Sequence, residues 1–288
     1  MLIIVNLVLF ASLIMIRTFF YFFYREDGQA EQFFAERALK WFVLPADLSQ
    51  LASRPWTILT APFSHVGVWA ILANMLWLWT FGYIMQDLTG NKKIIPVFIY
   101  GGIAGAIGFL AIYNLTPSLQ AQVPVATYFG ANAGIAAIAV ATTMVSPGYR
   151  LFPMLKGGFP LWILTLIYLL VSVATVPVFS AAYFVPLVAG AVMGWLFMMM
   201  VRIGYDWSDW MNNFYDWINN LFNPDKPKKG MDIKEELFYK ASSKPFTRTP
   251  NLTQQRIDEI LDKINQKGYG FLTEEEKSLL KRASEEDV

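Results

Sequence analysis

The feature that most limits the fold of this chain is a set of six long apolar runs, each close to the length of a membrane-spanning helix. A hydrocarbon core of about 30 Å requires roughly 20 apolar residues in a helix. The first run has no basic residue ahead of it and no cleavage site, so we interpret it as an uncleaved anchor. The sequence therefore predicts an all-α polytopic membrane protein, a six-transmembrane-helix bundle with a cytoplasmic C-terminal helical hairpin. The expected spans cover about residues 1–24, 66–85, 94–113, 128–145, 159–178 and 181–201.

Composition agrees with a membrane protein and limits its chemistry. Hydrophobic residues make up 55% of the 288-residue chain, charged residues make up 16%, and the mean hydropathy is +0.39. Cysteine is absent from the sequence, which excludes disulfides and iron–sulfur clusters. His65 is the single histidine of the sequence, so we expect neither a multi-histidine metal site nor a cofactor. A net charge of +1 gives no reason to expect a nucleic-acid partner.

The distribution of lysine and arginine predicts the orientation of the spans. Basic residues occur in the loops after the second and fourth spans and after the sixth, whereas the loops after the third and fifth spans have none. This alternation places both termini in the cytoplasm. Residues 25–64 would then lie outside, although they include four basic and five acidic side chains. Their apolar residues indicate either a helical piece sunk into the outer interface or an ordinary solvated loop.

The segment after the sixth span has the pattern of an amphipathic helix. Over residues 204–223, aromatic residues recur at three- and four-residue spacing, with aspartates and asparagines between them. Such a helix either lies on the membrane surface, with its indoles at head-group level, or packs against the bundle. Its aromatic face consists of Trp207, Trp210, Phe214 and Trp217.

The C-terminal part of the chain differs in composition from the spans. A linker at 224–252, rich in proline and lysine at its start, leads to a predicted two-helix hairpin at 253–288. Thr273 and Glu276 have the spacing of a capping box at the start of the second helix. A hairpin of this size seldom buries enough apolar surface to be stable alone. We therefore expect it to dock, either on the protein's own cytoplasmic face or on a cytoplasmic partner.

Four local patterns occur in sequence along the predicted spans. The second span begins FSHVGVWAILANMLWLWTFG, the third contains YGGIAGAIG, the fourth opens GANAGI and the sixth contains LVAGAVMGW. In this order, and after a long first outer loop, they resemble the rhomboid intramembrane serine proteases over about residues 1–203. The tail hairpin, with GFLTEEEKSLLKRAS, is similar to one that follows rhomboid cores in Bacteroidota-type bacteria. The resemblance implies a rhomboid-like transmembrane domain in a bacterial inner membrane.

The resemblance also implies where catalytic residues would lie. In the family, a serine in a G-x-S pattern on the fourth span is the nucleophile, and a histidine in an H-x-x-G-x-x-x-G pattern on the sixth is the general base. A histidine and an asparagine spaced H-x-x-x-N on the second span help to hold the oxyanion. Here the nucleophile position falls on Asn132, the base position on Leu187, and the oxyanion positions on Ala70 and Asn74. Because a carboxamide and an isobutyl group cannot perform the covalent chemistry, the resemblance predicts a pseudoprotease.

Small residues four apart let helices approach closely in lipid, and the chain retains them in three of the spans. Asn74 and Asn132 match positions that face each other in the family site. We therefore expect either a hydrogen bond between the two amides or a bond from Asn132 to a backbone carbonyl or to water. The glycines expected to pack helices together are Gly101, Gly105, Gly130, Gly134, Gly190 and Gly194.

Three functions are compatible with these patterns. The first is a catalytically inactive rhomboid-like protein that binds membrane-protein partners, because the scaffold is kept while the catalytic pair is lost. The second is a fixed accessory subunit of a larger inner-membrane complex for secretion, insertion or respiration, because the aromatic residues and the tail hairpin suit permanent contacts. The third is an active intramembrane serine protease. It has the least support, because no Lys, His, Asp or Glu accompanies Ser172 or Ser180 within the spans.

Overall fold

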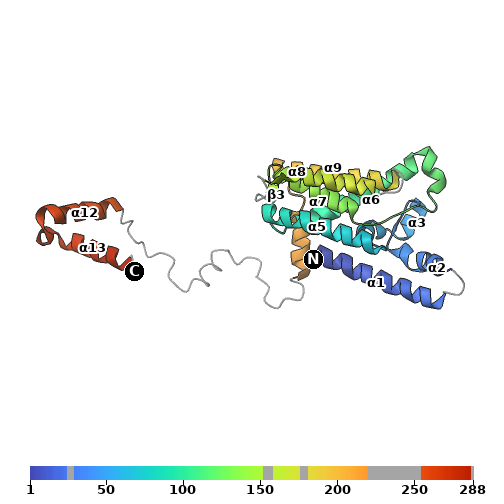
Figure 1. Cartoon of the computed structure of the whole chain (residues 1–288), viewed down its shortest axis with the longest axis horizontal. Helices are drawn as coiled ribbons and strands as arrows, with labels where there is room; N and C mark the ends of the chain where they lie inside the picture. The colour runs from blue at the N-terminus through green and yellow to red at the C-terminus, as the bar shows by residue number, and fades with distance from the viewer. Residues whose placement is uncertain (25–28, 152–157, 176–180, 220–253, 287–288) are drawn as a thin grey trace. The chain divides into compact units, whose positions relative to one another are not determined.

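The computed structural model describes residues 1–24, 29–151, 158–175, 181–219 and 254–286. These residues belong to two compact units, 1–222 and 223–288 (Figure 1). The predicted linker at 224–252 lies outside the described residues.

The first unit is an all-α bundle whose helices run side by side (Figure 1). Among its described residues, four helices are long and apolar enough to cross a membrane, and two apolar helices of 14 residues accompany them. The long helices are α1 (Leu2–Phe23), α5 (Val68–Thr89), α6 (Ile94–Leu115) and α9 (Ala181–Ile203); the short ones are α7 (Asn132–Val145) and α8 (Leu161–Ala174). An all-α membrane bundle is confirmed, while the count of six spans stays a prediction.

Helices α7 and α8 begin later than the expected fourth and fifth spans because extended segments precede both helices; residues 176–178 of the expected fifth span lie outside the described residues. Residues 127–128 form strand β2 (Thr127–Tyr128), and Gly130 has φ +108°, so helix α7 begins only at Asn132. Helix α8 follows strand β4 (Phe159–Pro160), which pairs with β3 (Arg150–Leu151). The second span is longer than predicted and ends at Gly90, where φ is +76°.

The segment between α1 and α5 is a packed cap of short helices rather than a solvated loop. Phe34 and Leu44 are buried, and the Trp41 and Trp56 rings stack with centroids 6.0 Å apart. Strand β1 pairs antiparallel with β2, placing Leu44 opposite Tyr128, so the cap is joined to the chain just ahead of α7. The cap contains α2 (Ala30–Arg37), η1 (Leu39–Trp41), β1 (Leu44–Pro45), α3 (Leu48–Ser53), α4 (Thr57–Thr60) and η2 (Ala61–Phe63).

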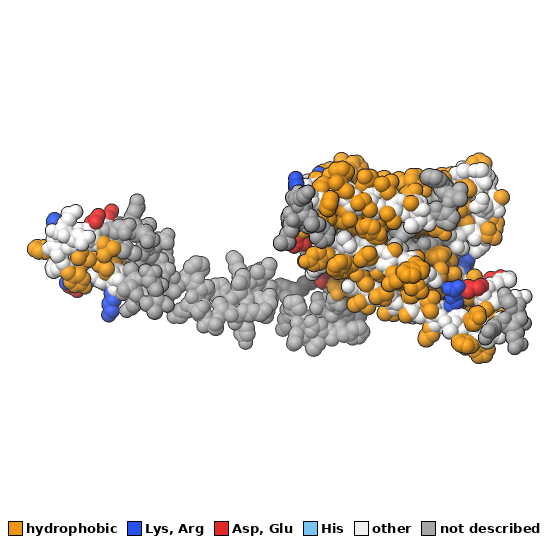
Figure 2. Space-filling model, in the orientation of Figure 1, with side chains coloured by type: hydrophobic (Ala, Val, Ile, Leu, Met, Phe, Trp, Pro, Cys, Tyr) orange, Lys and Arg blue, Asp and Glu red, His pale blue; other side chains and the backbone are white. Residues whose placement is uncertain are grey.

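The outer surface of the bundle is apolar, as expected for helices that face lipid. Figure 2 shows hydrophobic side chains over the middle of the bundle and charged side chains toward its two ends. Exposed examples include Ile4 on α1, Leu76 on α5 and Leu170 on α8. In a bilayer, exposure of these apolar side chains costs no free energy, because hydrocarbon is the surrounding solvent.

Helix α10 (Asp209–Asn219) corresponds to the middle of the amphipathic segment predicted at 204–223, and in Figure 1 it runs across the direction of the bundle helices. The Tyr100 hydroxyl holds its start: it donates to the Trp207 carbonyl at 3.1 Å and accepts from the Trp210 indole at 2.6 Å. Lys93 also pairs with Asp206 at 3.2 Å. Trp207 packs on the bundle core, whereas Trp210, Phe214 and Trp217 are exposed. Contact with the bundle is thus seen at Trp207 and at the Trp210 indole, and a membrane-surface setting for the exposed aromatic residues stays a prediction.

The second unit is a helical hairpin of α12 (Gln254–Lys267) and α13 (Glu274–Glu286), joined through η5 (Tyr269–Phe271). The predicted capping box forms. The Thr273 backbone N–H donates to the Glu276 carboxylate at 2.8 Å, and the Glu276 N–H donates to the Thr273 hydroxyl at 3.3 Å. Glu276 also pairs with Lys263 at 2.7 Å, which links the second helix to the first.

Candidate functional site

The candidate site lies where α7 packs between α6 and α9. Gly190 and Gly194 of α9 face Ala133 and Ala137 of α7: a Cβ at either glycine would lie 2.2 or 2.1 Å from the carbonyl oxygen of its partner alanine. On the other side of α7, Gly105 and Gly101 of α6 face the same two alanines, with 2.4 and 2.3 Å between their Cβ positions. Each alanine is therefore held between two glycines, and α7 cannot move away from either neighbour without losing contacts.

Two other expected packing glycines have different roles. Gly134 packs on α6 rather than on α9, since a Cβ there would lie 2.7 Å from the Phe98 ring. Gly130 is buried and its N–H donates to the Ala61 carbonyl at 2.9 Å, but a Cβ there would have no atom within 4 Å. Its φ of +108° explains the residue instead, because side-chain-bearing residues rarely adopt this conformation. The expectation that Gly130 permits close helix contact is therefore wrong. It turns the chain from β2 into α7.

Asn132 is the first residue of α7 and lies at the start of this close contact. Its backbone carbonyl accepts a hydrogen bond from the Tyr168 hydroxyl of α8 at 2.9 Å. Its side chain is half-buried. Leu187 lies three residues before Gly190 on α9, is 4% exposed, and belongs to the same buried cluster as Ala131. The two positions implied by the resemblance to be nucleophile and base thus lie on helices in contact, with a carboxamide and an alkyl group in place of a hydroxyl and an imidazole.

Asn74 has a partner that the sequence did not predict. Its amide nitrogen lies 3.0 Å from Nε2 of His65, and Nδ1 of His65 lies 3.3 Å from the Phe63 carbonyl oxygen. Both contacts are satisfied when the imidazole is neutral and its proton is on Nδ1. Within the described residues no hydrogen bond joins Asn74 to Asn132, so the expected amide pair does not form. The short loop before α5 brings His65 back over its own helix and provides a nearer acceptor.

His65 is buried, with 2% of its surface exposed, in the segment ahead of α5. Burial lowers its pKa below the ordinary value of 6.5, and the weaker effect of the Phe63 carbonyl opposes this. A neutral imidazole already engaged at both nitrogens has no free nitrogen with which to activate a hydroxyl. Ala70, at the first oxyanion position, is exposed and offers no donor side chain.

Tyr168 is a central residue that sequence reasoning missed. It is 1% exposed, and its ring contacts Trp77 and Phe81 of α5 at centroid distances of 5.2 and 5.7 Å. With its hydrogen bond to Asn132, it joins α8 to both α5 and α7. A lone tyrosine within an apolar run was the available signal, because a phenolic hydroxyl inside a membrane needs a partner.

The chemistry available at this site is that of packing and neutral hydrogen bonds. Within the parts of the chain that the structure describes, no group of three or more His, Cys, Asp or Glu side chains is placed to hold a metal ion. The groups nearest to a reactive arrangement are the amides of Asn74 and Asn132, the His65 imidazole and the Tyr168 hydroxyl. Three of these four side chains make the hydrogen bonds described above, and none has a partner that would make it a nucleophile.

Comparison with known proteins gives one family match in each unit. Residues 52–204 match the Rhomboid domain, and residues 248–286 match a family of unknown function (DUF6576). The chain is 28% identical over 109 residues to "Rhomboid-like protein 16, chloroplastic" of Arabidopsis thaliana, and 26% identical over 101 residues to "Rhomboid-like protein 17, chloroplastic" of the same plant. These alignments cover 34% and 32% of each chain, so this protein spans about a third of the length of these curated relatives.

Proposed function

The chain belongs to the rhomboid family, and from this membership we propose that it is a catalytically inactive member that binds other membrane proteins. The observation that carries the proposal is the α7–α9 contact. Its glycines and alanines interlock closely, while Asn132 and Leu187 occupy the positions where the family resemblance expects the serine and its base. Loss of the dyad together with a tightly fitted scaffold is what we expect of a protein retained for its shape.

Hydrolysis can be tested directly. The full chain, reconstituted in vesicles, should cleave a fluorescent transmembrane peptide no faster than protein-free vesicles do. Cleavage that exceeds this control, and that is abolished by mutation of a serine, a threonine or His65 of the chain, would overturn the proposal of an inactive protein.

Binding requires a different experiment. A photoreactive residue in place of Leu166, which is 48% exposed on α8, should crosslink to a single-span helix of another protein in native membranes. The matched control is Val8, which is 60% exposed on α1. A crosslink of equal yield from both positions, or to lipid alone, would contradict a specific client surface near α8.

The second candidate is a fixed subunit of a larger inner-membrane complex. It is favoured by the apolar side chains left exposed on the hairpin unit: Leu261 at 44%, Tyr269 at 59% and Phe271 at 72%. Purification in mild detergent distinguishes the candidates. The same partners in stoichiometric amounts would support a subunit, and varied partners in smaller amounts would support a client binder.

The same proposal places the protein in a bacterial inner membrane, with both termini in the cytoplasm. The alternation of basic loops supports the orientation, and the similarity of the tail hairpin to one that follows bacterial rhomboid cores supports the bacterial membrane. Because the sequence has no cysteine, single cysteines introduced at Gln120 and at Gly148 report the two sides separately. An impermeant thiol reagent applied to intact spheroplasts should label position 120 and not position 148. The reverse pattern would invert the topology.

A further inference from the structure

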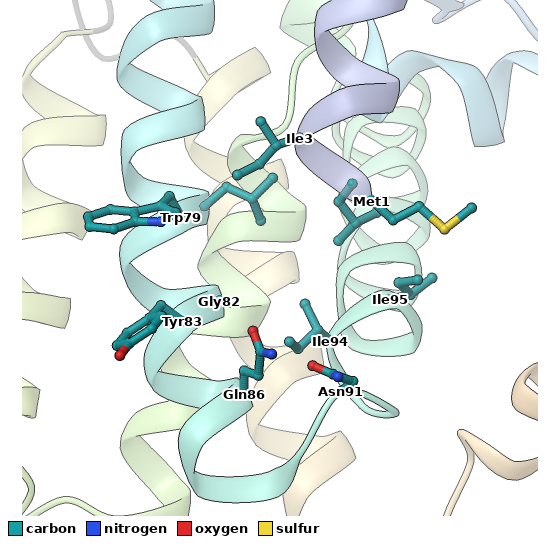
Figure 3. A pocket seen from close by; sticks show the side chains of 11 residues that line it. Met1, Ile3, Trp79, Gly82, Tyr83, Gln86, Asn91, Ile94 and Ile95 are labelled. Atoms are coloured by element: carbon teal, nitrogen blue, oxygen red, sulfur yellow. The ribbon is translucent and has the colours of Figure 1, made fainter.

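A cavity of about 400 Å³ lies between α1, α5 and α6, away from the α7–α9 contact. Figure 3 shows the residues that line it. Its walls come from the first turn of α1, the C-terminal half of α5, and the turn that leads into α6. The lining includes Ile3, Leu78, Gly82, Gln86, Asn91 and Ile94.

Gly82 keeps this cavity open. It lies within α5 and is buried, yet a Cβ added there would meet no atom within 4 Å. The glycines of α6 and α9 at the α7 contact, Gly101, Gly105, Gly190 and Gly194, behave differently, because a Cβ at each would lie within 2.4 Å of an alanine on α7. A glycine inside a helix reduces helix stability relative to alanine. Close packing against another helix does not explain Gly82, and the open space beside it belongs to the cavity.

The lining changes from apolar to polar along α5. Ile3 lies at one end, and the amides of Gln86 and Asn91 lie at the other beside Ile94, with the Gln86 side chain directed into the cavity (Figure 3). Leu78, which also lines the cavity, precedes Gln86 by about two turns of α5. The eight residues from Leu78 to Gln86 correspond to a rise of about 12 Å. This order matches an amphiphile whose hydrocarbon part faces the membrane interior and whose polar part faces its boundary.

The level of the cavity also suits such a molecule. Asn91 is followed directly by Lys92 and Lys93, and Lys93 pairs with Asp206 at the start of the segment that leads into α10. The polar end of the cavity thus lies at the same end of the bundle as the exposed tryptophans of α10, where membrane boundaries place indoles. Neutral amide N–H groups there can donate to ester and phosphodiester oxygens.

Size argues against a protein helix as the occupant. One turn of a helix about 10 Å across fills roughly 400 Å³, so the cavity has room for a single turn and not for a spanning segment. The polar head and the first methylenes of one lipid need no further space at this depth, since the acyl chains continue into the surrounding hydrocarbon.

We propose that this cavity binds one glycerophospholipid of the bilayer, with its head group and glycerol esters on Gln86 and Asn91 and its chains along Leu78 and Ile3. The site is independent of whether the protein hydrolyses or holds other proteins. It uses no residue of the α7–α9 contact.

Native mass spectrometry of the full chain tests the proposal. Protein freed of lipid in mild detergent is titrated with phosphatidylethanolamine, and the wild-type chain should take up one saturable adduct. Gly82→Leu fills the open space and should lose that adduct while keeping the thermal unfolding temperature. Gln86→Leu removes a head-group contact and should weaken the adduct, which provides a second variant if Gly82→Leu does not fold. Leu76→Ala, at a lipid-facing residue that is 61% exposed and does not line the cavity, should bind as the wild type does.

The contrary outcomes are equally defined. An adduct unchanged in a folded Gly82→Leu variant and in Gln86→Leu, or non-saturable binding in the wild type, would overturn the site. A photoreactive residue at position 82 gives an independent result in native membranes. A crosslink to phospholipid supports the proposal, and a crosslink to a protein would replace the lipid with a protein occupant.

Discussion

Asn74 and His65 illustrate, at the scale of single residues, how a polar pair is accommodated in an apolar bundle. The amide donates to a neutral imidazole at 3.0 Å, and both side chains are buried. A buried polar group without its partner loses more free energy than the bond itself contributes, so each side chain depends on the other.

Replacing Asn74 with leucine should therefore lower the free energy of unfolding by about 1–3 kcal/mol, because Nε2 of His65 would be left buried without a donor. Reversible unfolding in mixed micelles measures the change. Ala70→Leu, on an exposed position of the same helix, is the matched control and should stay within about 0.5 kcal/mol of the wild type. Equal losses in the two variants would show that the hydrogen bond has no specific role.

His65 also predicts a pH dependence. Burial lowers the pKa of the folded His65 below 6.5, so as the pH falls through 6.5 the unfolded chain binds a proton that the folded chain does not. The free energy of unfolding should decrease as the pH falls below 6.5 and should be unaffected by this residue above it. His65→Gln removes the titrating group, and its stability should vary less than that of the wild type between about pH 5 and pH 7. Identical pH profiles would exclude His65 as the source.

At the scale of residues, motif spacing singles out Asn132, Leu187 and Asn74, but it does not predict which groups their side chains contact. The partner of Asn74 depends on how the loop before α5 turns, and no periodicity encodes that turn. Gly130 was misjudged for a related reason: a glycine in a small-residue pattern has the same letter whether it serves close packing or a positive φ. Only the backbone conformation separates the two roles.

At the scale of elements, α7 is held by matched contacts on two sides. Ala133 and Ala137 each face one glycine of α6 and one of α9. In lipid, this close packing replaces the hydrophobic driving force that assembles helices in water. The helices of the bundle were predictable from their apolar runs, but the later starts of α7 and α8 were not, because paired two-residue strands are too brief to leave a pattern.

Gly194→Ala should destabilise the bundle by about 1–3 kcal/mol, because the new methyl group would force α7 and α9 apart or displace their backbones. Its Cβ would lie 2.1 Å from the Ala137 carbonyl oxygen. Gly82→Ala is the matched control within another helix: its Cβ meets open space, and alanine favours the helix by about 1 kcal/mol. Thermal unfolding of both variants in the same detergent should move in opposite directions. A loss at Gly82 as large as that at Gly194 would refute the packing argument.

For the molecule as a whole, a rhomboid bundle and a separate helical hairpin are combined in one chain. The hairpin's capping box was predictable because it depends on two residues three apart, whereas docking of the hairpin stays a prediction. The capping box depends on residues within one turn of helix, whereas the surface of a binding partner would be encoded in another chain.

The double variant Asn132→Ser, Leu187→His tests the relation between scaffold and chemistry. If α7 and α9 hold these positions in contact, the variant should cleave a transmembrane peptide at a measurable rate, far below that of an active enzyme because Ala70 still leaves one oxyanion donor missing. Each single variant should remain inactive, because nucleophile and base act as a unit. Activity in either single variant would mean that Asn132 and Leu187 are not the nucleophile and base positions.

The shortness of α7 has a consequence for how the protein is made. Its 14 residues rise only about 21 Å, less than the roughly 30 Å of a hydrocarbon core. During synthesis α7 leaves the ribosome after α6 but well before α9, so half of the surface that will hold it does not yet exist. Until residues 181–203 arrive, α6 alone offers α7 the glycines that it packs against. Helix α9, which is translated later, therefore completes the contacts of a helix that precedes it in the chain.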